Sequence, residues 1–152
     1  MTIAQTATTS FKVQLLQAVH NFGPTSPNTF KVALFTAAAN INATTTAYTV
    51  GMTGEVANGN GYVTGGNTLV ISVSPTSGNN TASIPTAFIS FSNSSWTNAT
   101  FSAAGALIYN DTVSGKPSVA VLDFGATKTV TNDTFQIIFP TPDANSAIVR
   151  IS

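Results

Sequence analysis

Apolar and polar positions alternate along most of this chain in short runs, the pattern of half-buried β-strands. Within residues 86–92, for example, Phe88 and Ser90 face one side while Ile89 and Phe91 face the other. Seven such runs, rich in β-branched and aromatic residues, predict strands at 30–37, 68–74, 86–92, 99–110, 118–125, 134–140 and 146–152. Clusters of Gly, Pro, Asn, Asp and Ser separate these runs and mark turns. The pattern predicts a mainly β fold, an antiparallel β-sandwich or jelly-roll-like barrel, in a single domain over residues 1–152.

One stretch has helical periodicity. Ser10 is a candidate N-cap and Gly23 a candidate stop signal, so we expect one N-terminal amphipathic helix over residues 10–23, after an extended arm at residues 1–9. The stripe that would pack on the core consists of Phe11, Leu15, Ala18 and Phe22. The opposite side would carry Val13, Leu16 and His20, where a lone surface helix is normally polar. We therefore expect Val13, Leu16 and His20 to contact a partner, and the arm could reach a neighbour by adding a strand to a sheet edge.

Charge is scarce and unevenly distributed. Charged residues make up 7% of the chain, and the 55 residues between Glu55 and Asp111 carry no formal charge at all. The polar surface must come from Thr, Ser and Asn, which fill 54 of the 152 positions. Net charge is zero, so the chain lacks the excess of positive charge with which proteins bind nucleic acid or an anionic membrane surface. Because net charge is what keeps free proteins apart, we expect a homo-oligomer or a subunit of a larger assembly.

The sequence gives no sign of export or of membrane insertion. The N-terminus lacks a basic region followed by an apolar core, and no run approaches the roughly 18 apolar residues of a membrane span. There are no cysteines, so disulfides and thiolate chemistry are excluded. We expect a soluble protein made in the cytoplasm of its host.

Candidate catalytic and metal-binding residues are few. His20 is the only histidine, and its setting in a predicted helix beside Leu16 favours a packed or interface role over that of a catalytic base. Of the five acids, only Asp123 lies inside a predicted strand; the others lie at turns or strand ends, where carboxylates cap backbone amides. A hydrolase would need a pair of these carboxylates, and we expect no catalytic residue, metal or cofactor.

Trp96 is the main candidate for ligand stacking. It stands in "NSSWTNAT", where it could form a carbohydrate platform or point inward from a short strand with polar neighbours pointing out. The three tyrosines share this ambiguity. The core alternative is the stronger one for Trp96.

Several stretches resemble a family of small virion structural proteins of tailed bacteriophages. The resemblance covers most of the chain from residue 10 onward and rests on "SFKVQLLQAVHNF", "FKVALFTAAAN", "TGEV" with "GYVTGG", "WTNATFSAAGALIYN", "VAVLDFG" and "NDTFQIIFPTPDANSAIVRI". It implies a non-enzymatic protein of the virion, most concretely a capsid decoration (cement) protein on the capsid surface, bound to the major capsid protein and to neighbouring copies of itself. The alternative is a tail or head fibre component that recognises a host surface glycan.

Overall fold

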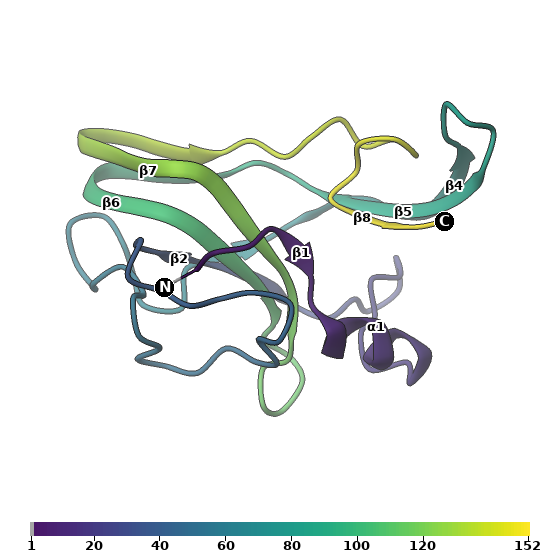
Figure 1. The fold of residues 1–152 in the computed structure, drawn as a ribbon, viewed down its shortest axis with the longest axis horizontal. Coiled ribbons are helices and arrows are strands. Elements are labelled where there is room, and N and C mark those ends of the chain that lie inside the picture. Colours follow the sequence, from purple (N-terminus) through teal and green to yellow (C-terminus); the bar gives the residue numbers. More distant parts are fainter. Residues whose placement is uncertain (1) are drawn as a thin grey trace.

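The computed structural model describes residues 2–152. The protein is mainly β, with two antiparallel sheets in a sandwich-like arrangement and one short N-terminal helix (Figure 1), which confirms the predicted fold class. The elements are β1 (Thr6–Ala7), α1 (Thr9–Leu16), β2 (Phe30–Phe35), β3 (Asn67–Leu69), β4 (Ile71–Asn79), β5 (Pro85–Phe91), β6 (Ser94–Asn110), β7 (Ser118–Ile137) and β8 (Val149–Ile151). One sheet has five strands in the order β1-β7-β6-β2-β3, and the other has three in the order β4-β5-β8.

Short links carry the chain between the two sheets. A single residue, Val70, separates β3 from β4, and two residues separate β5 from β6. The three-stranded sheet therefore projects from one end of the five-stranded sheet, on the side where α1 lies (Figure 1). The two sheets are unequal in size, which leaves apolar side chains on each side of their junction incompletely covered.

The long hairpin of β6 and β7 differs from the sequence prediction. Two strands were expected at 118–125 and 134–140, with a turn between them, but β7 is one strand of 20 residues. Its pairing with β6 is interrupted by register shifts, and Gly125, Asn132 and, on β6, Asn98 have positive φ angles. The turn-forming residues thus make bulges, which bend a strand without ending it.

The centre of the five-stranded sheet, at β2, is buried on both faces. The inner face carries Val32 and Leu34 into the core between the sheets, while Ala33 and Phe35 on the opposite face pack under the N-terminal arm and the chain around Ile41. For this reason β2 is almost continuously buried and does not alternate between buried and exposed positions.

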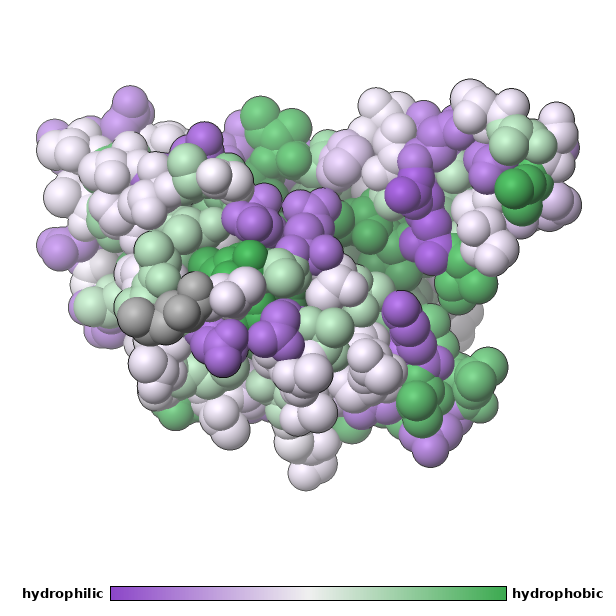
Figure 2. All heavy atoms as spheres, in the orientation of Figure 1, coloured by the Kyte–Doolittle hydropathy of each residue, from purple (hydrophilic) through white to green (hydrophobic). Residues whose placement is uncertain are grey.

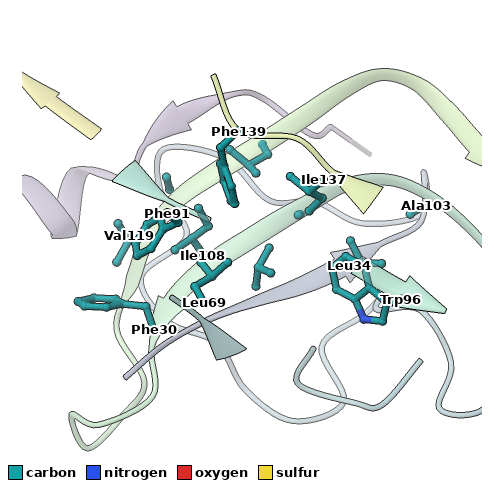
Figure 3. Close-up of a cluster of buried hydrophobic side chains, with 14 of the residues drawn as sticks. Phe30, Leu34, Leu69, Phe91, Trp96, Ala103, Ile108, Val119, Ile137 and Phe139 are labelled. Carbon is teal, nitrogen blue, oxygen red and sulfur yellow. The ribbon is translucent and has the colours of Figure 1, made fainter. Parts of the chain in front are cut away.

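Aromatic side chains from both sheets fill the inner core. Figure 3 shows Phe91 beside Val119 and Ile108, with Phe139 next to it. The ring centroids of Phe30 and Phe91 are 5.9 Å apart, and those of Phe91 and Phe139 are also 5.9 Å apart. These contacts hold the three-stranded sheet against the larger one.

The helix is shorter than predicted, and its N-cap lies two residues before the expected one. The hydroxyl of Thr8 accepts a hydrogen bond from the Phe11 N–H (3.4 Å), so Thr8 and not Ser10 is the N-cap. The helix ends at Leu16, because Ala18 adopts a left-handed conformation (φ 56°) that the sequence did not signal. The predicted helix over 10–23 is therefore wrong in its C-terminal half.

The N-terminal arm lies against its own chain. Ile3 forms a bridge with Ile41, and β1 pairs with β7 at Val121 and Ala120. The Ile3 side chain fits over Gly105, where an ideal Cβ would lie only 2.7 Å from Ile3 Cγ2. The described part of the arm is extended, as predicted, and it packs on its own chain. Met1 is outside the described residues.

Candidate partner-binding surface

The outer side of α1 carries two exposed apolar side chains. Val13 is 51% exposed and Leu16 is 92% exposed, whereas Phe11 on the inner side of the same helix is buried. These are two of the three residues predicted to meet a partner. The contact itself stays a prediction.

An apolar groove runs beside α1, between the segment that follows the helix and the three-stranded sheet. It has a volume of about 390 Å³. Its apolar walls include Leu15 and Phe22 on the helix side and Ala87, Ile89, Val149 and Ile151 on the sheet side. None of the described residues that line it carries a formal charge at neutral pH. We call this feature the α1 groove; Figure 2 shows hydrophobic side chains on both sides of the gap between α1 and the sheet.

His20 is not on the outer face of the helix, in contrast to the prediction. The chain turns after Leu16, and this turn carries His20 inward until only 7% of it is exposed. Its ring lies 5.0 Å from that of Phe11 and 6.2 Å from that of Phe22, measured between centroids. A partner that contacts α1 from outside would meet little of this side chain.

The hydrogen bonds of His20 fix it as a neutral imidazole. Its Nε2 lies 2.9 Å from Gln14 Oε1, and its Nδ1 lies 3.1 Å from the side-chain nitrogen of Asn110. Since Asn110 Nδ2 can only donate, Nδ1 accepts and Nε2 carries the proton. Burial lowers the pKa of His20 to about 4, which agrees with this pattern. Both ring nitrogens are occupied, so His20 serves to anchor the segment after α1 and has no free nitrogen for catalysis.

A second apolar groove lies along β7, where the chain leaves that strand. It has a volume of about 450 Å³, and its apolar lining includes Leu122, Phe124, Phe135, Ile137, Phe139 and Ile148. Asp123 and Lys128 also line it, as does Ile138, which is strongly exposed. Unlike the α1 groove, this β7 groove therefore carries opposite charges among its apolar residues.

Trp96 lies in the core, as the stronger alternative for it predicted. It is 3% exposed, and its ring packs against Tyr62 and Phe135. Figure 3 shows it beside Leu34. Tyr48, Tyr62 and Tyr109 are buried as well, and the remaining aromatic residues are buried or half-buried. The described chain thus offers no exposed aromatic platform on which a sugar could stack.

Glu55 organises a buried polar cluster that the sequence did not reveal. Its carboxylate accepts hydrogen bonds from the hydroxyls of Tyr48 and Tyr62, both at 2.9 Å, and from the Gly65 N–H at 2.7 Å. Tyr109 donates to the Gly65 carbonyl (2.8 Å) and stacks on Tyr48. Burial raises the pKa values of all three phenols far above their usual range, so they remain protonated donors. In the sequence, only the position of Glu55 between two tyrosines hinted at this cluster. Its role is to hold the loop between β2 and β3 in place.

The remaining acids have structural partners. The carboxylates of Asp123, Asp133 and Asp143 accept hydrogen bonds from nearby backbone N–H groups, and Asp111 pairs with Lys116. Asp123 is exposed, and its carboxylate accepts a hydrogen bond from the Gly125 N–H in the bulge. Among residues 2–152, no group of three or more His, Cys, Asp or Glu side chains is placed to hold a metal ion. The same residues contain no helix of the length and apolarity that crossing a membrane requires.

Comparison with known proteins identifies no relative of this chain. No family model, no curated protein and no solved structure matches this chain.

Proposed function

We propose that this protein is a non-enzymatic structural component of a bacteriophage virion, most concretely a capsid decoration protein that binds the major capsid lattice and neighbouring copies of itself. The observation that carries the proposal is the α1 surface: Val13 and Leu16 are exposed beside a groove whose described lining is uncharged. Apolar surface that a folded chain leaves uncovered and contiguous is typical of protein–protein contact sites.

The surface chemistry of the rest of the chain supports the same function. Residues 56–110, which run from the loop before β3 to the end of β6, carry no formal charge. Their exposed polar groups are hydroxyls and amides. Neighbouring subunits can pack such surfaces closely without like-charge repulsion, and weak contacts repeated over a lattice add up through avidity.

The polar groups that could serve catalysis support a structural function as well. The single histidine is buried, neutral and bonded at both nitrogens. Glu55 is engaged with two tyrosines and a backbone amide. Each of these groups has a partner that explains its position within the fold.

Replacing both Val13 and Leu16 with Asp is expected to leave the fold intact and to abolish incorporation into particles. Both side chains point to solvent, so the fold loses little, whereas two buried carboxylates would oppose any contact at α1. Particles from a phage that carries the variant gene would be purified, and this chain would be quantified against the major shell protein on a gel.

The matched control replaces Val50 and Val63 with Asp. These valines are also exposed, but they lie in the segment between β2 and β3 and do not line the α1 groove. The control should be incorporated like the unaltered protein. Normal incorporation of the Val13→Asp/Leu16→Asp variant would refute the role of α1, and loss of its circular dichroism spectrum would show that this face belongs to the core.

A further inference from the structure

The exposed side chains of α1 and the α1 groove lie next to each other on one surface. Leu15 lines the groove, and Leu16, the next residue, is the most exposed large apolar side chain of those described. Ile151, on the opposite wall, is 56% exposed. The surface therefore combines an apolar projection, Leu16, with an apolar groove of about 390 Å³.

A projection beside a groove can make one surface complementary to the same surface of a second copy, as a two-fold symmetric interface requires. In such an interface the same patch of both copies takes part, so the projection of each copy meets the groove of the other. We propose that two copies of this chain pair through α1, with Leu16 of each copy seated in the α1 groove of the other, against Ile151.

The charges around the groove are compatible with a second copy as the occupant. The whole chain is neutral, so two copies approach without net repulsion. The groove's only titratable side chain, His20, faces Phe11, Phe22 and Phe30 and bonds to uncharged amides. Lys12 precedes Leu16 by one helical turn and is exposed, and its long side chain can keep the ammonium in water at the rim.

The chain has no cysteine, so single cysteines report on this contact without background. The variants Leu16→Cys and Ile151→Cys would be mixed and treated with a short bismaleimide, and covalent dimers would be measured on a denaturing gel. We expect at least tenfold more dimer from this mixture than from Leu16→Cys mixed with Val63→Cys, whose valine is exposed but distant from the groove in sequence and lies outside its lining. Equal yields from the two mixtures would overturn the proposed geometry.

Sedimentation equilibrium tests the pairing without cross-linking. The unaltered chain should sediment as a dimer at micromolar concentration, and Leu16→Asp should shift it to a monomer while Val63→Asp leaves the dimer in place. A second variant, Ala87→Glu, places a charge on the sheet wall of the groove, away from the helix, and should also give a monomer. The inference would be refuted if the unaltered chain were a monomer, or if the dimer survived both Leu16→Asp and Ala87→Glu.

This inference rests on the proposed function in one respect: both take the partner of α1 to be a protein subunit. A monomeric chain that is abundant in virus particles would overturn the pairing and leave the proposed function in place. A groove-dependent dimer that is absent from particles would establish the pairing and overturn the virion role.

Discussion

Gly66→Ala is expected to lower the free energy of unfolding by about 4 kcal/mol. Gly66 has a φ of +71°, and an ideal Cβ there would lie 1.8 Å from the carbonyl oxygen of Val32 and 2.6 Å from its carbonyl carbon. Both atoms belong to the backbone of β2, so neither can move without disturbing the central sheet. Urea unfolding followed by tryptophan fluorescence would measure the loss, because the single Trp96 is buried in the core.

The variant Gly51→Ala serves as a control, because it shows the cost of the left-handed backbone conformation without the steric clash expected at Gly66. Gly51 has a similar φ of +80°, but no atom lies within 4 Å of its ideal Cβ. Its replacement should cost about 1–2 kcal/mol, the strain of a left-handed residue alone. Equal losses for the two variants would show that Gly66 does not approach β2 as closely as the structure indicates.

Glu55→Ala is expected to destabilise the fold by about 3 kcal/mol. The substitution leaves the buried Tyr48 hydroxyl and the buried Gly65 N–H without their acceptor, and each unsatisfied group costs about 1–3 kcal/mol. Tyr62 keeps one partner, because its hydroxyl also accepts a hydrogen bond from the Leu34 N–H (3.1 Å). The measurement is again the free energy of unfolding in urea, at neutral pH.

Two comparisons give this prediction a control. Asp133→Ala removes an exposed carboxylate whose hydrogen bond goes to the adjacent Thr134 N–H, and it should change stability by less than about 1 kcal/mol. A double-mutant cycle of Glu55→Ala with Tyr48→Phe should give a coupling energy above about 1 kcal/mol. If Glu55→Ala were as mild as Asp133→Ala, the carboxylate would not hold the tyrosine cluster together.

The parts of the fold that were predictable are those where local pattern and tertiary environment agree. The β-branched and aromatic runs at β2 and β5 became strands close to their predicted bounds. The burial of Trp96 followed from its position between polar residues that alternate outward on β6. In each case the period of two in the sequence matches the two sides of a strand.

Elsewhere a local signal had two meanings that only tertiary structure distinguishes. Glycine and asparagine between 125 and 132 predicted a turn, but the facing strand β6 continues alongside, so they form bulges within β7. Ala18 ends α1 without any stop residue, because the turn there lets His20 and Phe22 reach the core. The candidate site was therefore half predictable: Val13 and Leu16 are exposed as their spacing indicated, while the groove beside them depends on the sheet formed by β5 and β8, which lie far along the chain.

The most direct test of the central claim is the copy number of this chain in the virus particle. Particles would be purified, and the chain would be quantified by gel densitometry against the major shell protein. A capsid decoration protein predicts a ratio near one, or a simple fraction such as a third or a half. Trace abundance would contradict the capsid assignment in favour of a tail or fibre position, and complete absence from the particle would contradict any virion role.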